Sequence, residues 1–389
     1  MFSSRLRQAA SRNRLALAME QRRAAGLAIV DLTLSNPTRA DLAYPKGLLA
    51  PLSHDVSLCY EPQPFGSASA RQAVSDDFAR RGISVPVART VLTSSTSEAY
   101  SLLFKLLCNP GDVVLAPRPS YPLIEHLTEL DGVSLEHYHL EFHGRWELDL
   151  EELRDKAGLG RVRAIIMINP NNPTGSVVAD DELAAVAAIA CEHGLALISD
   201  EVFADYPISG GSPGSALRQE TALTFALGGL SKSAGLPQVK LGWIGAGGPE
   251  PLVAGAMERL ETICDAYLSV SMPVQVAAPD LLRAGASIRS QIHARVRGNY
   301  AELSALASAH PACAVMPVEA GWYAVVQVPA LAGEDTIVVD LLEQTGVLVH
   351  PGYFFDFERE AFIVLSLLPE PKVFLAAVQA LFEQIGARR

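Results

Sequence analysis

The sequence lacks the features of a disulfide scaffold, a zinc site, a membrane span and a nucleic-acid binder. Its five cysteines are scattered, odd in number and without a CxxC pair, which predicts free thiols in the cytoplasm and no metal site. No apolar run approaches the roughly 18 residues that a membrane span needs. Acidic residues outnumber basic ones by 43 to 31, so neither nucleic acid nor a membrane is expected as a partner.

What is present indicates a large α/β protein. A chain of 389 residues that is 49% hydrophobic can bury a large core, but it is long enough to divide into two unequal lobes. Short apolar runs alternate with helical patterns through its middle. This alternation predicts a three-layer α/β/α domain with a mostly parallel sheet. The strand-sized runs are DVVLAP, VSLEHYHL, RAIIMINP, LALISD, ALTFALGG and LGWIGA.

The two ends of the chain are predicted to form a smaller α+β domain. Near the N-terminus a helix is expected before the strand-like VDLTLSNP, with an apolar side made of Leu6, Ala10, Leu15, Leu17 and Met19. Long helices are expected at 251–269 and 280–309, followed by strands in WYAVVQVP, GVLVHPG and FIVLSLL and a last helix at 372–385. The predicted division is 1–45, 46–284 and 285–389, with the active cleft where the lobes meet.

Three polar residues each follow a strand-like run of the predicted sheet. Asn172, Asp200 and Lys232 lie about 30 residues apart, so parallel strands would deliver them to one edge. Taken singly, they are typical of a turn residue, a helix cap and a solvated lysine. Together they indicate one site.

The order of these and neighbouring motifs resembles the pyridoxal 5′-phosphate aminotransferases of fold type I, in the class I and II group. The resemblance covers nearly the whole chain, and the co-occurrence of its motifs is more specific than any one of them. The motifs are LTLSNPT, YEPQPFGSASARQAV, LTSSTSEAYSLLFKLLCNPGDVVLAPRPSYP, NPNNPTG, DEVFADY, SKSAGLPQVKLGW and GVLVHPGYFF.

The resemblance implies a role for each matching residue. Lys232 matches the lysine that forms the Schiff base and then moves a proton between the substrate α-carbon and the cofactor. Asp200 matches the carboxylate that pairs with the pyridine nitrogen. Asn172 matches the amide that binds the ring oxygen O3′, and Tyr121 matches the aromatic ring that stacks on the cofactor.

The resemblance also implies residues for the phosphate, the substrate and the second subunit. Tyr60 matches a tyrosine that reaches the phosphate from a neighbouring subunit, so a homodimer is expected. Asn36 and Arg39 are candidates for binding the substrate. The remaining phosphate ligands are Ser95, Thr96 and Ser97, which precede the helical EAYSLLFKLL and so open a helix N-terminus, together with Ser231 and Lys240.

Three departures from the family pattern affect the cofactor and the substrate. Phe203 replaces a tyrosine that donates to O3′, which predicts a higher pKa of the Schiff base unless Tyr206 compensates. Lys240 replaces an arginine at the phosphate. Val364 replaces the arginine that binds the substrate carboxylate. Either another cation, with Arg39 and Arg359 as candidates, has taken that role or the substrate has no carboxylate there.

The function expected from the resemblance is amino-group transfer. An amino-acid-like donor would pass its amino group to a 2-keto acid by a ping-pong mechanism. The alternatives are another pyridoxal phosphate enzyme, such as a lyase, decarboxylase, cyclase or oxidase, and a cofactor-binding protein without catalysis.

Overall fold

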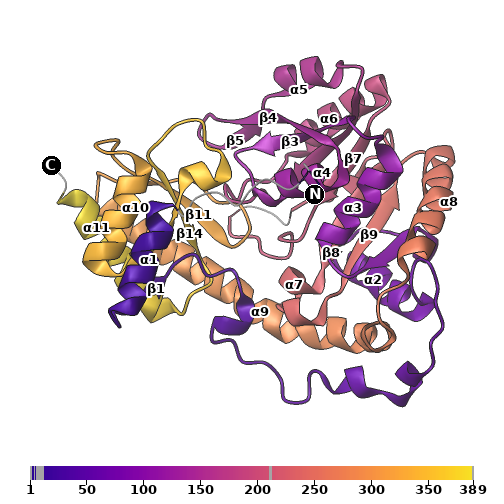
Figure 1. The fold of residues 1–389 in the computed structure, drawn as a ribbon, viewed down its shortest axis with the longest axis horizontal. Coiled ribbons are helices and arrows are strands. Elements are labelled where there is room, and N and C mark those ends of the chain that lie inside the picture. The colour runs from indigo at the N-terminus through magenta and orange to yellow at the C-terminus, as the bar shows by residue number, and fades with distance from the viewer. Residues whose placement is uncertain (1, 4, 6–12, 210–212, 388–389) are drawn as a thin grey trace.

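The computed structural model describes residues 2–3, 5, 13–209 and 213–387. A broad lobe is built on a large sheet, and a smaller lobe contains α1 and the C-terminal part of the chain (Figure 1). This arrangement confirms the predicted fold class. Within the described residues, no helix has both the length and the apolar character needed to cross a membrane.

The large sheet has eight strands in the order β2-β9-β8-β7-β6-β3-β4-β5. The five central strands β8, β7, β6, β3 and β4 are parallel, whereas β9 and β5 run antiparallel to their neighbours. Each of the six predicted runs forms a strand, while β2 and β5 were not predicted. The bounds are β2 (Thr90–Thr93), β3 (Val113–Arg118), β4 (Ser134–Phe142), β5 (Trp146–Leu148), β6 (Val162–Ile168), β7 (Ala196–Asp200), β8 (Thr224–Gly229) and β9 (Gly242–Gly247).

Helices cover both faces of this sheet. In β6, Ile166 packs in one apolar cluster with α3, α4 and α8, while Ile165 and Met167 pack in another with α5 and α6. Because both faces are buried, the strand is a continuous apolar run without alternation. The helices are α3 (Thr96–Leu107), α4 (Leu123–Asp131), α5 (Leu150–Ala157), α6 (Asp180–His193) and α8 (Glu250–Tyr267).

The small lobe joins the two ends of the chain. Its antiparallel sheet has the order β10-β11-β14-β13, and β1 pairs in parallel with β12. Strand β1 is shorter than expected, and Leu6 and Ala10 lie outside the described residues. The strands are β1 (Val30–Asp31), β10 (Ala314–Val315), β11 (Tyr323–Gln327), β12 (Val347–Leu348), β13 (His350–Pro351) and β14 (Phe362–Ser366), and the helices are α1 (Arg14–Ala24), α10 (Glu334–Thr345) and α11 (Pro371–Gly386).

The longest helix, α9 (Met272–Ser308), links the two lobes (Figure 1). It begins eight residues before the predicted 280, because Pro273 fits the first turn and the helix continues through Pro279. It packs against α2 (Ala68–Arg80) and α7 (Leu230–Ser233) of the large lobe and against α11 of the small lobe. The predicted boundary at 284/285 falls inside this helix, and the division into three segments stays a prediction.

Short 3-10 helices complete the described structure. They are η1 (Pro37–Arg39), η2 (Ala50–Ser53), η3 (Asp55–Leu58), η4 (Val87–Arg89), η5 (Ala216–Arg218), η6 (Pro237–Val239) and η7 (Gly352–Phe355).

Candidate active site

A cavity of about 650 Å³ lies where the two lobes meet, at the carboxyl ends of β6, β7 and β8. Asn172, Asp200 and Lys232 all line it. The cavity lies at the position predicted for the cleft, since adjacent parallel strands end at one edge of a sheet. The small lobe contributes Thr33, Ser35, Tyr323, His350 and Phe355 to the opposite wall.

Asp200, the last residue of β7, is held by two hydrogen bonds. The Tyr100 hydroxyl from α3 donates to its Oδ2 at 3.2 Å, and the Val202 amide donates to its Oδ1 at 3.2 Å. Burial raises the pKa of Asp200 to about 6, while these two donors and the nearby Lys232 charge oppose the rise. Tyr100 itself stays protonated, because burial and the Asp200 charge raise the pKa of its phenol well above the usual value.

Lys232, in α7, points its amine into an aromatic and weakly polar setting. Its Nζ lies 5.1 Å from the ring centroid of Trp322 and 5.8 Å from that of Phe203, and it donates to the Ser35 carbonyl at 3.4 Å. Burial lowers the pKa of Lys232 to about 8, and the charge of Asp200 limits this fall. A much larger fraction of the amine is therefore neutral, and nucleophilic, at neutral pH than in an exposed lysine.

Tyr206 does not take the place of the missing phenol at position 203. It is fully buried, and its hydroxyl donates to the Lys232 backbone carbonyl. Its contacts therefore favour a packing role for Tyr206 over compensation for Phe203. Its role is to fix the backbone that carries Lys232.

Asn172 and the start of α3 fit a ring-shaped anion that carries a phosphate. The Oδ1 of Asn172 is buried at the cavity without a hydrogen-bond partner among the described residues, so the site holds an unsatisfied polar group. A Cβ at Gly242 would come within 2.9 Å of the Ser95 carbonyl carbon, so this glycine lets the start of α3 lie directly on β9. Helix starts present unpaired amides that bind phosphate.

The other predicted phosphate ligands line the same cavity. The Ser95 hydroxyl caps α3 by accepting a hydrogen bond from the Glu98 amide at 3.2 Å. The cavity is lined by Ser95, Thr96, Ser97, Tyr121, Ser231 and Lys240, together with the residues above.

Three predicted residues do not reach the cavity in this protomer. Tyr60 is 63% exposed on the segment after η3. The Asn36 side-chain oxygen accepts from the Thr38 amide at 3.0 Å and its hydroxyl at 2.7 Å, because it caps η1. Arg39 lies exposed at the end of η1. Thr33 and Ser35 line the cavity and Asn36 and Arg39 do not, and substrate binding by Asn36 and Arg39 stays a prediction.

Several residues that line the cavity were not predicted from the sequence. Leu32 is buried, and in an extended chain Thr33 and Ser35 point to the side opposite Leu32. This alternation could have placed both on the side that faces the cavity. His350 stands between a strand-like run and Pro351-Gly352, where a chain turns at a strand end. Tyr100 had no such signal, because its partner Asp200 lies 100 residues away in the sequence.

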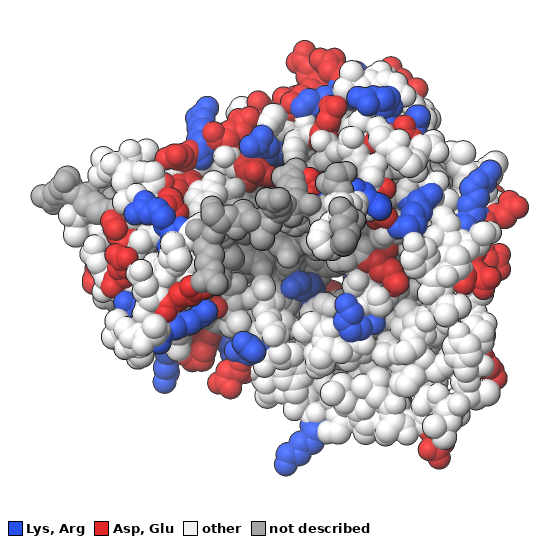
Figure 2. All heavy atoms as spheres, viewed as in Figure 1, with Lys and Arg blue, Asp and Glu red and all other residues white. Residues whose placement is uncertain are grey.

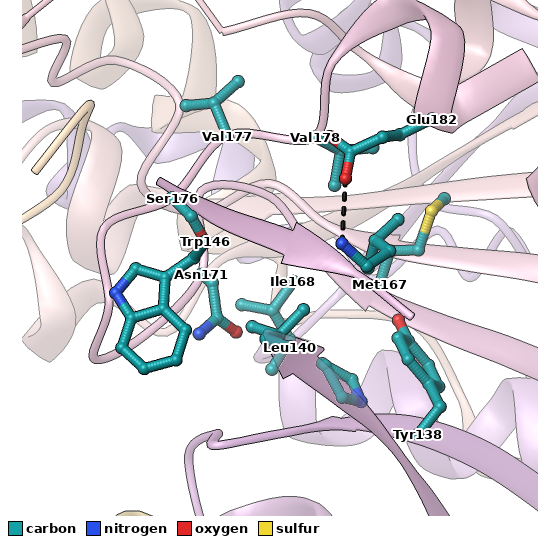
Figure 3. A pocket seen from close by; sticks show the side chains of 12 residues that line it. Tyr138, Leu140, Trp146, Met167, Ile168, Asn171, Ser176, Val177, Val178 and Glu182 are labelled. Carbon is teal, nitrogen blue, oxygen red and sulfur yellow. Dashed lines mark hydrogen bonds between the residues drawn. The ribbon is translucent and has the colours of Figure 1, made fainter. Parts of the chain in front are cut away.

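A second pocket, shown in Figure 3, is too small to bind a substrate. It has a volume of about 10 Å³ and is lined by Trp146, Asn171 and Glu182, among others. Glu182 Oε1 accepts from the Leu148 amide at 2.8 Å across it (Figure 3). The volume corresponds to about one water molecule. In the described part of the chain, no group of three or more His, Cys, Asp and Glu side chains could hold a metal ion.

Comparison with known proteins decides the family. Residues 59–373 match the family described as Aminotransferase class I and II. The chain belongs to the class I and II aminotransferase family. Members of this family use pyridoxal phosphate.

The family relatives differ in the reaction that their names state. Glutamate-pyruvate aminotransferase AlaA of Escherichia coli (strain K12) is 32% identical over 214 residues, covering 54% of this chain and 53% of that protein. S-alkyl-thiohydroximate lyase SUR1 of Arabidopsis thaliana is 30% identical over 225 residues, covering 56% of this chain and 48% of that protein. The chain thus spans about half the length of the curated relatives that it matches.

Solved structures of the family share the fold over the whole chain. An aminotransferase from Escherichia coli superposes with a TM-score of 0.87 at 24% identity, covering 100% of this chain and 98% of the other. The alanine aminotransferase from Pyrococcus furiosus also gives 0.87, at 22% identity and 96% coverage of both chains.

Proposed function

We propose that the chain is a pyridoxal phosphate-dependent aminotransferase that moves an amino group from an amino-acid-like donor to a 2-keto acid by a ping-pong mechanism. The observation that carries this proposal is the convergence of Asn172, Asp200 and Lys232 from adjacent parallel strands beside a helix start that suits a phosphate. When bound, pyridoxal phosphate supplies an electron sink for the carbanion at the substrate α-carbon.

Lys232 supplies the amine that holds the cofactor and moves the proton. With a pKa of about 8, its Nζ can be neutral when it attacks and can carry a proton when it acts as an acid. The rings of Trp322 and Phe203 restrict the directions open to that amine.

Asp200 and Asn172 hold the ring of the cofactor. The donors from Tyr100 and Val202 favour the charged form of Asp200, which an interaction with a protonated ring nitrogen requires. Asn172 lines the cavity, and the Nδ2 of its side-chain amide can donate a hydrogen bond to the ring oxygen. Tyr121 would stack on the ring, and the phosphate would lie at Ser95, Thr96 and Ser97, with Ser231 and Lys240 beside it.

The active unit is proposed to be a homodimer. The segment that leads to Tyr60 exposes Leu58 at 86% and Val56 at 59%, which is unusual for apolar side chains. The lower right of Figure 2, over this segment, carries few charged side chains. A second copy packed there would cover these residues, and its Tyr60 could reach the phosphate of the neighbouring site.

Substitution of Lys232 by alanine tests the assignment of the anchor. The wild-type protein, incubated with pyridoxal phosphate and reduced with borohydride, is expected to carry the cofactor on Lys232 in peptide mass spectrometry. Lys232→Ala should lose that modification while Lys240, the other lysine of the cavity, stays unmodified. A reduced adduct retained on the mutant chain would refute the assignment.

A lyase on the same fold is the second candidate, because no arginine lines the cavity among the described residues and one relative is named as a lyase. Incubation of the holoenzyme with amines in the absence of an acceptor separates the two. Stoichiometric formation of pyridoxamine phosphate and one carbonyl product supports transamination, and release of a fragment over many turnovers supports the lyase.

A further inference from the structure

The wall of the cavity opposite Lys232 is one face of the small sheet. Val364 of β14 pairs with Val325 of β11 and with His350 of β13. Directly paired residues share a face, and so does Tyr323, two residues before Val325. Tyr323 and His350 line the cavity, so this face closes it. Val364 lies in this face as a fully buried residue, at the position where the family pattern has a guanidinium.

No other arginine in the described part of the chain lines the cavity in place of the one missing at Val364. Within the described residues, the charged cations that line the cavity are Lys232 and Lys240, both assigned to the cofactor. Arg359 lines a different groove together with Arg118. The Arg118 Nε is engaged by the Asp356 carbonyl at 2.8 Å.

His350 is the polar side chain that stands beside Val364. Its ring packs against Phe354 and Phe355, with centroids 5.8 and 5.6 Å away. Burial lowers the pKa of His350, with Asp31 opposing the fall, so burial favours the neutral form of the ring. A neutral imidazole donates through one nitrogen and accepts through the other, and no described residue forms a hydrogen bond with either nitrogen of this ring.

Among the described residues, an α-carboxylate at this wall would have no cation to pair with besides the two lysines assigned to the cofactor. Phe355 packs on the His350 ring, and an unpaired anion beside an apolar group is unfavourable. A hydroxyl or a carboxamide, in contrast, can both donate to and accept from a neutral imidazole.

We propose that the cavity prefers a primary amine whose neighbouring group is an uncharged hydroxymethyl or carboxamide in place of a carboxylate, and that His350 binds this group. The inference rests on the proposed transamination. In the half-reaction the substrate C–NH₂ becomes C=O while the aldehyde of the cofactor becomes CH₂NH₂, so nitrogen and oxygen exchange and no outside oxidant is needed.

L-leucine, L-leucinamide and L-leucinol form a matched set, since they differ in the group that His350 would contact. Wild-type holoenzyme is mixed with each, and conversion of the cofactor to its amine form is followed by absorbance. The amide or the alcohol is expected to exceed leucine in kcat/KM by at least 10-fold. Leucine reacting as fast as both of its analogues would overturn the proposal.

Three variants assign the preference to this wall. His350→Phe is expected to lower kcat/KM for the preferred analogue by at least 10-fold, with less effect on leucine. His350→Gln, which keeps a donor and an acceptor, should lose less kcat/KM than His350→Phe. Arg359→Ala is the control that tests whether Arg359 binds the substrate carboxylate, and it should leave kcat/KM for all three substrates unchanged. A selective loss of leucine turnover in Arg359→Ala would contradict the proposal.

A binding measurement keeps the inference separate from turnover. The holoenzyme is titrated by calorimetry with 4-methylpentanamide and 4-methylpentanoate, which carry no amine and cannot react. The amide is expected to bind at least 10-fold more tightly, and tighter binding of the carboxylate would overturn the inference. If none of the three amines converts the cofactor, the proposed function fails, while this pair still decides the preference of the cavity.

Discussion

Tyr100 acts on the cofactor site through Asp200, which it holds with one hydrogen bond of 3.2 Å. Tyr100→Phe keeps the ring that packs on Phe104 and removes that donor. Because the donor favours the charged carboxylate, its loss should raise the pKa of Asp200 above about 6 and weaken pyridoxal phosphate binding by about 10-fold near neutral pH. Fluorescence titrations of the apoprotein from pH 5.5 to 8.5 measure this.

The pH dependence identifies the cause of the loss. Asp200 must be charged to pair with a protonated ring nitrogen, so the affinity of the variant should recover toward the wild-type value as the pH rises. A uniform loss at every pH would instead indicate a packing defect and would contradict the positioning role of Tyr100.

Phe203 leaves the ring oxygen of the cofactor without a phenol donor. Its ring is buried and packs edge-on against Trp322 and Tyr323, at centroid distances of 5.4 and 6.0 Å. Phe203→Tyr adds a hydroxyl, and a donor to the oxygen anion should lower the pH midpoint of the cofactor's absorbance change by roughly one unit. Tyr206→Phe removes a hydroxyl that donates to the Lys232 carbonyl, and it should leave the pH midpoint of the absorbance change where it is in the wild type. An equal shift in both variants would argue against this cause.

At the scale of elements, two glycines of α9 differ only in their surroundings. A Cβ at Gly285 would lie 2.5 Å from the Cβ of Ala234, just after α7, whereas a Cβ at Gly298 would meet nothing within 4 Å. Gly298→Ala should raise the free energy of unfolding by about 0.5–1 kcal/mol through helix propensity. Gly285→Ala should lower it by about 1–3 kcal/mol through overpacking.

Denaturant unfolding of the apoproteins compares these two variants under identical conditions. Gly285→Ala should also slow the attachment of pyridoxal phosphate, since Ala234 lies two residues after Lys232. Equal free energies of unfolding for the two variants would show that α9 packs less tightly against α7 than the structure shows.

The central strands β3, β6, β7 and β8 of the large sheet were predictable, because strands buried on both faces are continuous apolar runs, whereas β2 and β5 were not predicted. The same pattern placed Asn172, Asp200 and Lys232 at one edge. The start of α9 was not predictable, since Pro279 looks like a helix boundary and tertiary packing overrides it. The link between His350 and Val364 depends on strand register, which the sequence of two strands does not contain.

At the scale of the whole molecule, the proposed dimer can be broken at Leu58. A charge at this exposed apolar residue should prevent burial against a second copy, so Leu58→Glu is expected to be a monomer at micromolar concentration in sedimentation velocity. Leu331→Glu is the matched control, since Leu331 is 66% exposed in the small lobe. A wild-type protein that is itself a monomer, or a dimer that withstands Leu58→Glu, would refute this surface.

Shared sites between copies have a second signature. We mix an inactive Lys232→Ala chain with a Tyr60→Phe chain under conditions that exchange subunits. Each hybrid dimer should then have one native site, with Lys232 from the Tyr60→Phe chain and Tyr60 from the Lys232→Ala chain. Recovery of activity above that of either parent supports a Tyr60 supplied by the neighbouring copy, and no recovery despite exchange argues against it.

Helix α9 ties both walls of the cavity to one backbone. Arg289 donates to the Ser233 carbonyl at 2.9 Å, next to Lys232, and Asn299 donates to the Leu367 carbonyl at 2.9 Å, just past β14. These anchors are ten residues apart, or about 15 Å along the helix. Local unfolding of this stretch would release both walls together, so its amides should exchange with solvent as one cooperative unit, and a ligand that bridges the walls should slow all of them alike.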